Sequence, residues 1–312
     1  MGGIFFSIIK TARPRQWLKN LALFATILIT GNIFNGHALT QTIWGFVAFC
    51  FLSSSNYIFN DVMDIERDKK HPFKRFRPVA SGQLPVPYAL STSLFFVIFG
   101  LGISYMLGSS FFILSVLFII LEYSYTMFLK HISVIDILAI TAAYFLRVYA
   151  GEAATGYHIS VWLALAALSL ALFLAIGKRR SELTLIQGYK GTSPNVTRES
   201  LSHYSEKLLD TYTAMFANST FITYAFYTFL ERPMYQGFFF RGYSDFLYDL
   251  QGRKWMMITI PFVLYGIMRY MQLIYEGKGE SPEKILTSDM PLLTTIILWT
   301  LSVFLVIYGI GG

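Results

Sequence analysis

Residues 44–78 read WGFVAFCFLSSSNYIFNDVMDIERDKKHPFKRFRP, an apolar run that ends in acids and then in bases. Its first half has the character of a membrane-spanning helix, which takes about 20 mostly apolar residues. Its second half holds Asp61, Asp64 and Asp68, the second and third acids lying three and seven positions after the first. Because positions i, i+3 and i+7 share one face of a helix, we predict that the three carboxylates gather where this helix leaves the membrane.

The composition of the whole chain supports a membrane location. Hydrophobic residues make up 54% of the 312 residues and charged residues only 14%, whereas an average soluble domain is about 25% charged. The net charge of +7 suits the cytoplasmic, anionic side of a membrane, where Lys and Arg accumulate. The bases lie in short breaks between apolar runs, so we expect no nucleic-acid partner. Cys50 lies in an apolar run and is interpreted as a small buried side chain.

Polar breaks divide the chain into a series of apolar stretches. They predict an all-α, polytopic integral membrane protein with about nine transmembrane helices, at roughly 17–35, 41–60, 86–107, 110–129, 133–150, 160–177, 207–230, 255–275 and 289–309. We expect one membrane-embedded domain over 1–312, in which 1–16 is an amphipathic surface segment. Residues 178–206 are predicted to be a cytoplasmic loop and 231–254 an external aromatic loop.

The distribution of bases predicts the orientation. With the N-terminus in the cytoplasm, 20 of the 25 Lys and Arg residues fall on the cytoplasmic side of nine spans. Such an asymmetry follows the positive-inside rule. We therefore predict a multi-pass protein of the cell inner (plasma) membrane with its active site facing the cytoplasm.

The acids suggest a metal site. Three carboxylates at a membrane boundary repel one another, and each is costly to desolvate. Mg²⁺ prefers hard oxygen ligands and commonly combines one or two carboxylates with substrate phosphates. We interpret Asp61, Asp64 and Asp68, with the amide oxygen of Asn60, as ligands of Mg²⁺ on a diphosphate. The alternative is a solvated helix end in which the acids pair with Arg or Lys.

Two groups of bases favour a phosphorylated substrate. Lys74, Arg75 and Arg77 follow the acids, and the second group follows the sixth predicted helix in LAIGKRRSEL. Guanidinium groups match phosphate oxygens bidentately. We therefore predict that both groups bind donor phosphates; the alternative is anchoring to the membrane surface. The second group consists of Lys178, Arg179 and Arg180.

Further bases converge on the same side of the membrane. Lys19 and Asn20 precede the first predicted span, and Lys130 closes the fourth. Arg147 lies inside an apolar helix, where ionisable groups are functional hypotheses by default. We assign these four residues to binding a second, acceptor phosphate. For Arg147, a structural pair with a residue such as Glu152 is the alternative.

The motifs taken together resemble a known family. NDVMDIERD at 60–68 resembles the first aspartate-rich motif of the UbiA superfamily of intramembrane prenyltransferases. Five further motifs narrow the resemblance to the decaprenyl-phosphate phosphoribosyltransferase branch, and they span most of the chain in consistent order. They are RPRQWLKN (13–20), HPFKRFRPVASG (71–82), YSYTMFLKH (123–131), GKRRSEL (177–183) and RYMQLIYEGKGESPEKILTSD (269–289).

The resemblance implies a UbiA-like helical bundle and a specific reaction. This is the Mg²⁺-dependent transfer of 5-phosphoribose from phosphoribosyl pyrophosphate to a polyprenyl phosphate, which releases pyrophosphate and makes a cell-envelope arabinose precursor. It also implies catalytic roles for the three aspartates. Ordinary UbiA prenyltransferases carry a second acidic motif where this chain has Lys178–Arg180, which suits a donor with an additional 5-phosphate. Tyr123 and Lys130 occupy the family's tyrosine-lysine motif, and Tyr123 is assigned to the donor phosphates.

Two other functions are compatible with part of the pattern. A UbiA-type prenyltransferase with a prenyl diphosphate donor shares the fold and the acidic motif, but not the basic GKRR element. An anionic-lipid transporter would have many spans with internal charges, but its site usually lies near the membrane midplane. A transporter would move lipid without a covalent product. The sequence leaves a homo-oligomer open.

Overall fold

The computed structural model describes residues 2–70, 73–188, 201, 203–231, 255–276, 285 and 288–310, with backbone alone at 2, 185–188 and 310. Within these residues the regular structure is helical and contains no strand, which confirms the all-α prediction. The predicted external loop lies, apart from Glu231, outside this part of the chain. Most of the predicted cytoplasmic loop beyond Gly188 lies outside it too.

Seven helices in the described part of the chain are long and apolar enough to cross a membrane. Each coincides with a predicted span, although the helix ends differ by several residues. The seven are Gly36–Met63, Val86–Met106, Ser109–Met127, Ile135–Thr155, Val161–Thr184, Trp255–Tyr275 and Met290–Gly309. The chain is thus a multi-pass membrane protein.

The other two predicted spans have a different form. Residues 17–35 do not make one helix: the 3₁₀ helix η1 (Pro14–Leu23) is followed by the short α2 (Phe24–Ile29). Residues 207–230 form most of α9 (Glu206–Leu230), which has the length of a span but is less apolar than the seven. The 3₁₀ start fits a segment that begins at proline and carries polar residues in its first turns, including Arg15 and Lys19.

The predicted end of the sixth span is wrong. Helix α8 runs over Val161–Gly188 and so continues through the GKRR element, which was predicted to begin a loop. The element contains no proline or second glycine that would break a helix, and Lys, Arg and Glu all have high helix propensity. Lys178, Arg179 and Arg180 therefore project from a continuous helix.

The chain divides into two compact units. The first contains residues up to Leu23, the stretch 40–155, and Leu201, His203 and Tyr204 of the segment before α9. Its elements are α1 (Gly2–Ala12), η1, most of α3 (Gly36–Met63), α4 (Ile65–Lys70), η2 (Lys74–Phe76), α5 (Val86–Met106), α6 (Ser109–Met127), η3 (Leu129–His131) and α7 (Ile135–Thr155). The expectation of a single domain over 1–312 stays a prediction.

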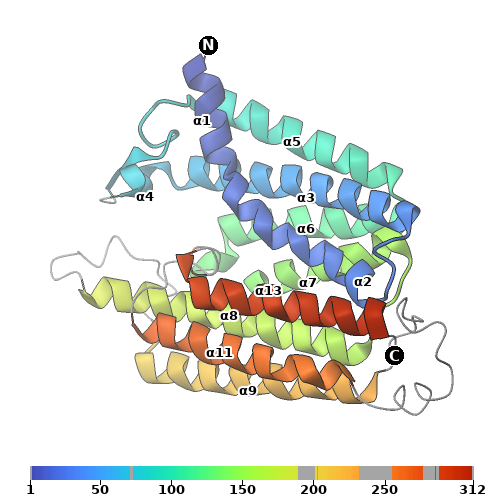
Figure 1. The fold of residues 1–312 in the computed structure, drawn as a ribbon. Helices are drawn as coiled ribbons and strands as arrows, with labels where there is room; N and C mark the ends of the chain where they lie inside the picture. Colours follow the sequence, from blue (N-terminus) through green and yellow to red (C-terminus); the bar gives the residue numbers. More distant parts are fainter. Residues whose placement is uncertain are drawn as a thin grey trace, which may run out of the picture. The chain divides into compact units, whose positions relative to one another are not determined.

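In the first unit, α6 packs against α5 and α7, and α7 packs against η1 (Figure 1). Phe49 of α3 lies in the core, with ring centroids 5.7 Å from Phe111 and 4.8 Å from Phe118 of α6. Glycine permits the closest approach: a Cβ on Gly151 of α7 would lie 2.2 Å from the backbone oxygen of Leu23. Small residues at such contacts are typical of helix packing in membranes.

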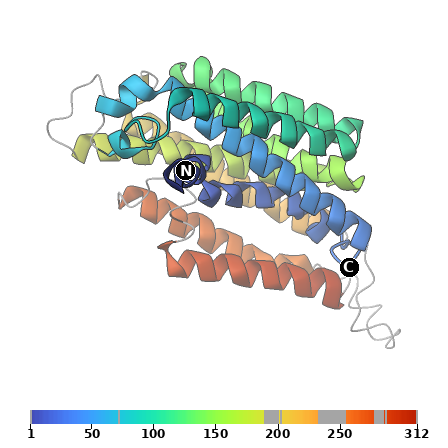
Figure 2. The same cartoon turned by 90° about the horizontal axis from the view of Figure 1, so that it is seen from above.

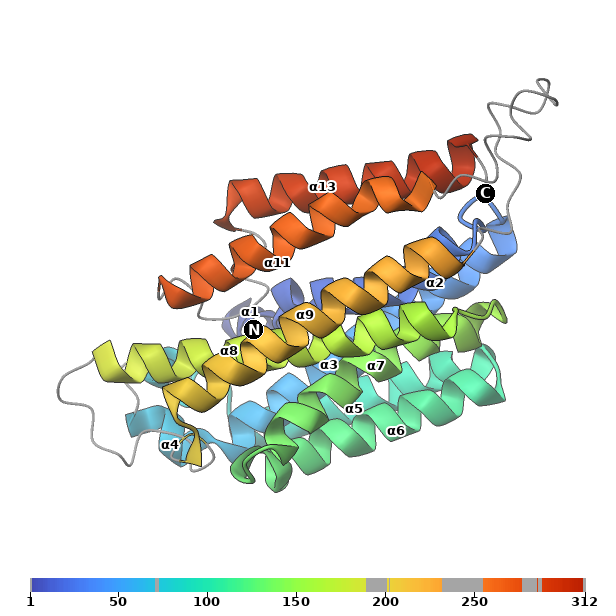
Figure 3. The ribbon, with the colours of Figure 1, turned by 90° about the horizontal axis from the view of Figure 1, so that it is seen from below.

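The second unit contains α2, α8, α9, the 3₁₀ helix η6 (Trp255–Thr259), α11 (Ile260–Tyr275), α13 (Met290–Phe304) and the π-helical turn η7 (Leu305–Ile310). Helix α8 packs along α9 (Figure 3), and α11 lies beside α13 (Figure 2). Asp289 caps α13 by accepting a hydrogen bond from the Leu292 N–H, 2.9 Å away. Arg269 of α11 binds the same carboxylate at 2.7 Å and so ties the two helices together.

Candidate functional site

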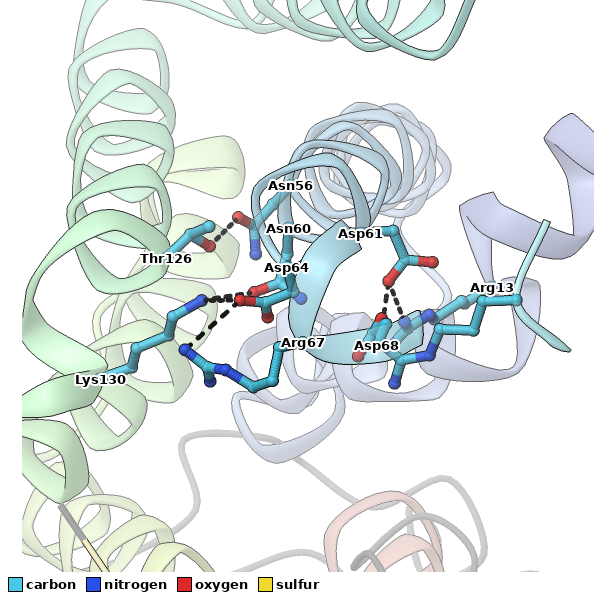
Figure 4. Close-up of polar contacts among 10 residues, drawn as sticks. Arg13, Asn56, Asn60, Asp61, Asp64, Arg67, Asp68, Thr126 and Lys130 are labelled. Carbon is cyan, nitrogen blue, oxygen red and sulfur yellow. Dashed lines mark hydrogen bonds and ion pairs between the residues drawn. The ribbon is translucent and has the colours of Figure 1, made fainter. Parts of the chain in front are cut away.

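The acidic motif lies where α3 gives way to α4. The backbone N–H of Asp64 donates to the Asn60 oxygen at 3.0 Å, and that of Asp68 donates to the Asp64 oxygen at 2.8 Å, so helical spacing continues across the junction. At 3.6 residues per turn, position i+7 returns to within about 20° of i, while i+3 stays about 60° away. Asp61 and Asp68 therefore share one face, and Asp64 points to the next (Figure 4). The prediction that all three carboxylates gather together is wrong for Asp64.

Arg77 joins the two acids of the first face. Its NH1 lies 3.2 Å from Asp61 Oδ1 and 2.7 Å from Asp68 Oδ2. Arg13 reaches the same Asp61 oxygen from the N-terminal segment, and its guanidinium lies 5.3 Å from the Tyr57 ring centroid. Both carboxylates are buried, at 2% exposure each. Buried carboxylates need such partners, and two guanidinium groups supply them here.

Lys130 serves the second face. It comes from η3, is 2% exposed, and places Nζ 2.8 Å from Asp64 Oδ1 and 3.5 Å from Asn60 Oδ1 (Figure 4). Arg67 NH2 lies 3.9 Å from the same Asp64 oxygen. The amide oxygen and the carboxylate of this face thus converge on one ammonium group.

A chain of buried and half-buried polar groups continues the second face into the membrane-spanning part of the unit. Asn56, one turn before Asn60, donates to Glu122 Oε2 at 2.6 Å and accepts from Thr126 at 3.1 Å. Glu122 Oε1 lies 3.5 Å from Arg147 NH2. Helices α3, α6 and α7 are therefore linked by polar contacts, of which Glu122 is the half-buried member.

Asn20 and Arg147, both assigned to the acceptor phosphate, lie in this interior. Arg147 Nε donates to Asn20 Oδ1 at 2.9 Å, and its NH1 donates to the Ala143 oxygen at 2.7 Å. The guanidinium also lies 4.6 Å from the Phe118 ring centroid. Lys19, adjacent to Asn20, is half-buried.

The remaining predicted donor contacts of the first unit lie in η2 and on α6. In η2, Lys74 is half-buried and Arg75 is exposed; they lie three and two residues before Arg77, respectively. The Tyr123 hydroxyl lies 2.8 Å from the Ser55 hydroxyl, and its ring stacks on Phe59 with centroids 4.5 Å apart. Tyr123 thus packs α6 against α3.

The GKRR element belongs to the second unit and is engaged within it. Arg180 Nε donates to Asp210 Oδ1 at 2.7 Å, and its NH2 lies 3.4 Å from Glu206 Oε2, both on α9. Arg179 is fully buried, and its NH1 lies 2.6 Å from Glu182 Oε2. These ion pairs give Arg180 a role in fastening α8 to α9, which the sequence analysis did not foresee.

The oxygen ligands that could hold a hard cation are arranged as two separate pairs rather than as one cluster. In the described part of the chain no three acidic, His or Cys side chains converge as a metal site. However, Asp61 and Asp68 share one positive group, and so do Asn60 and Asp64. Each pair presents oxygen atoms to a cation, and Mg²⁺ needs only one or two carboxylates when substrate phosphates complete its shell.

Sequence reasoning missed two members of the polar chain. Glu122 is an acid inside the apolar run of α6, a signal that marks an intramembrane functional or structural site. Asn56 lies four and eight residues before Asn60 and Asp64, a helical spacing that the sequence also displays. The partner suggested for Arg147 was Glu152, on the same helix, whereas Glu122 contacts it from α6.

A comparison with known families decides the affiliation. The model described as the UbiA prenyltransferase family matches residues 21–182, just over half of the 312 residues. This chain belongs to the UbiA prenyltransferase family. The match covers α3 to α8 and therefore includes the acidic motif, Lys130 and the GKRR element, so it confirms the superfamily indicated by the motifs.

Curated relatives that match over nearly the whole chain carry a narrower name. A decaprenyl-phosphate phosphoribosyltransferase of Corynebacterium glutamicum is 31% identical over 306 residues, covering 96% of this chain and 86% of the relative. The enzyme of the same name from Mycolicibacterium smegmatis is 32% identical, with 96% and 92% covered.

Solved UbiA structures confirm the fold. A UbiA homolog from Archaeoglobus fulgidus, bound to GPP and Mg²⁺, superposes with a TM-score of 0.72 at 18% identity, covering 96% of this chain and 98% of that one. A digeranylgeranylglyceryl phosphate synthase structure gives 0.65 at 15% identity, covering 98% and 100%.

Proposed function

We propose that this UbiA protein transfers 5-phosphoribose from phosphoribosyl pyrophosphate to a polyprenyl phosphate and releases pyrophosphate. The observation that carries the proposal is the 31–32% identity, over 96% of the chain, to enzymes named decaprenyl-phosphate phosphoribosyltransferase. The alternation of acids and bases around α4 supports it, because a donor with a diphosphate and a second phosphate requires both kinds of group. The product would be a precursor of cell-envelope arabinose.

The donor diphosphate would meet the two acidic pairs. Asp61 with Asp68, and Asn60 with Asp64, would hold Mg²⁺, which when bound neutralises the leaving pyrophosphate as a Lewis acid. The same acids now neutralise Arg77, Arg13 and Lys130. With Mg²⁺ on these acids, the three cations would instead face phosphate oxygens, so each buried charge would keep an opposite charge beside it.

Charge stabilisation of the leaving group is the main task of these residues. Bond cleavage at ribose C1 leaves negative charge on pyrophosphate, and preorganised cations stabilise it at low reorganisation cost. Arg77 is suited to this role because it lies directly beside Asp61 and Asp68, the acids that would hold Mg²⁺ on the donor. Lys74 and Arg75, in the same short segment, are assigned to the donor as well.

The acceptor requires binding rather than activation. A polyprenyl phosphate is anionic near neutral pH, so its oxygen can attack C1 without a strong general base, and attack opposite the leaving group inverts that centre. Lys130 is the proposed contact for this phosphate, because its ammonium group is directed to the helix end. Asn20 and Arg147 bind each other in the interior, so we assign them to bracing η1 against α7.

The proposed orientation places this chemistry at the cytoplasmic face of the inner membrane. The argument is the excess of Lys and Arg in the segments before α2, after α3 and at the end of α8. A cytoplasmic face also suits a soluble, highly charged donor that does not cross membranes.

The experiment is a transfer assay with the full chain in detergent, radiolabelled phosphoribosyl pyrophosphate, Mg²⁺ and decaprenyl or undecaprenyl phosphate. Label should move into the organic phase, EDTA should abolish the transfer, and Asp61→Asn should lower it about a hundredfold or more. Glu66→Gln serves as the matched control, because Glu66 is an exposed acid of the same segment that pairs with Lys69. Absence of lipid-linked label with both acceptors, from protein that remains folded, would overturn the proposal.

A prenyl diphosphate is the second candidate donor. The fold similarity to a UbiA homolog solved with GPP and Mg²⁺ favours it. The basic GKRR element, in place of a second acidic motif, argues against it. Transfer from geranyl diphosphate to an aromatic or polar acceptor, without transfer from phosphoribosyl pyrophosphate, would decide for this candidate.

A further inference from the structure

The turn between η3 and α7 contains a strained residue. Val134 has φ of 68°, and it is one of two non-glycine residues in the described part of the chain with positive φ; Arg13 is the other. The left-handed region is unfavourable for L-residues, and most unfavourable for β-branched ones such as valine. Such strain persists only where the surroundings over-determine the backbone, and it often marks functional sites.

Tyr204 supplies the constraint from far along the chain. Its hydroxyl accepts a hydrogen bond from the Val134 N–H at 2.6 Å and donates one to Asp136 Oδ1 at 2.7 Å. Asp136 Oδ1 also accepts from the Ile137 N–H at 2.8 Å. Tyr204 is 5% exposed and Asp136 fully buried. One hydroxyl thus satisfies a backbone donor and a carboxylate that would be costly to leave without partners.

The strained turn adjoins the segment that carries Lys130. Only Ile132 and Ser133 separate η3 from Val134, and the Val134 oxygen accepts from Ile137 and Leu138 at the start of α7. The backbone conformation of Val134 therefore sets the direction in which the chain passes from η3 into α7. A change of φ there would swing Lys130 away from Asn60 and Asp64.

We propose that Tyr204 is a positioning residue for Lys130, which it holds at the acidic motif by locking the strained Val134 turn. The contribution of this clamp to turnover rests on the proposed function, in which Lys130 binds the acceptor phosphate. The clamp itself is a statement about geometry and is tested without turnover. Burial raises the pKa of the Tyr204 hydroxyl above its ordinary 10.0, so the hydroxyl stays neutral at physiological pH.

The first test measures how well the Lys130 amine is protected. Full-length protein in detergent is treated with acetic anhydride, and acylation of Lys130 is followed by mass spectrometry against exposed Lys69. Tyr204→Phe removes the hydroxyl's hydrogen bonds to both Val134 and Asp136, and it should raise the Lys130 rate at least about fivefold. Tyr88→Phe is the matched control, because Tyr88 is an exposed tyrosine of α5. An unchanged Lys130 rate in Tyr204→Phe would overturn the proposal.

A second variant tests the strain directly. Glycine adopts positive φ without penalty, so Tyr204→Phe combined with Val134→Gly should restore protection of Lys130 toward the wild-type rate. A double variant as reactive as Tyr204→Phe alone would show that the turn is not held under strain, and would also overturn the proposal.

Measurements of turnover then distinguish a positioning role of Tyr204 from a general role in stabilising the fold. Tyr204→Phe should raise the KM for polyprenyl phosphate, and it should have no further effect in a Lys130→Ala background. Full additivity of the two changes would contradict the clamp. If protection of Lys130 responds as predicted while no phosphoribosyl transfer is detected in any variant, the proposed function fails and the clamp stands.

Discussion

The Lys130 ammonium lies 2.8 Å from Asp64 Oδ1, although 66 residues separate the two along the chain. Lys130 is 2% exposed, and Asp64 supplies an opposite charge beside its buried ammonium group. Lys130→Ala should lower kcat/KM for polyprenyl phosphate at least about tenfold, equivalent to about 1.4 kcal/mol. Lys69→Ala, which removes an exposed base of the same region, should leave the value unchanged. Equal effects of the two substitutions would argue against a specific role for Lys130.

Asp61 is the acid that two guanidinium groups share, and we expect its replacement to be the most damaging in the acidic motif. Asp61→Asn preserves size and removes the charge that would hold Mg²⁺, so turnover should fall about a hundredfold or more. Titration of Mg²⁺ in the transfer assay should show a higher concentration for half-maximal activity. Wild-type Mg²⁺ dependence in this variant would remove Asp61 from the metal site.

Glu66→Gln is the control for Asp61→Asn, and the Glu66–Lys69 ion pair has a predictable pH dependence. A hydrogen bond from Lys69 lowers the pKa of the Glu66 carboxyl below its ordinary 4.5. The contribution of this exposed pair to stability is therefore present above pH 4.5 and is lost as the pH falls through the lowered pKa. Glu66→Gln should leave both turnover and melting temperature at neutral pH unchanged, because exposed pairs contribute little. A loss of turnover in Glu66→Gln would show that the effect of Asp61→Asn is not specific to the predicted metal ligands.

Arg180 tests whether the GKRR element binds substrate or holds helices. Asp210→Asn weakens the contact between α8 and α9, and it should lower the melting temperature by a few degrees, equivalent to about 1 kcal/mol. Arg180→Ala should destabilise similarly and should in addition raise the KM for phosphoribosyl pyrophosphate. If the KM rises equally in both variants, Arg180 acts only by fastening α8 to α9.

Gly151 tests the close contact between α7 and η1. A Cβ there would meet the backbone oxygen of Leu23 at 2.2 Å, so Gly151→Ala must push the two elements apart and disturb the Arg147–Asn20 hydrogen bond. We expect a loss of about 1–3 kcal/mol in thermal unfolding. Gly102→Ala on α5, where no atom lies within 4 Å of the added carbon, should be neutral or slightly stabilising. Similar melting curves for both variants would contradict the packing.

Local pattern was sufficient to predict the seven apolar helices and the position of the acidic motif. It was insufficient where distant segments decide the outcome. Nothing near Asp61 indicates that Arg13 will reach it, and the partner of Asp64 comes from η3, 66 residues along the chain. The charges of Lys178–Arg180 predict the start of a loop, whereas α8 continues to Gly188, and Asp210 and Glu206 on α9 compensate Arg180. Tyr204 carries no local signal of its contact with Val134.

The most direct test of the central claim is a competition between donors in one vessel. Purified protein, Mg²⁺ and decaprenyl phosphate are supplied with phosphoribosyl pyrophosphate labelled in the ribose and an equal amount of geranyl diphosphate with a different label. The account predicts that only the ribose label enters the lipid fraction, with one pyrophosphate released for each ribose transferred. Entry of the prenyl label alone, into lipid or any added acceptor, would contradict it.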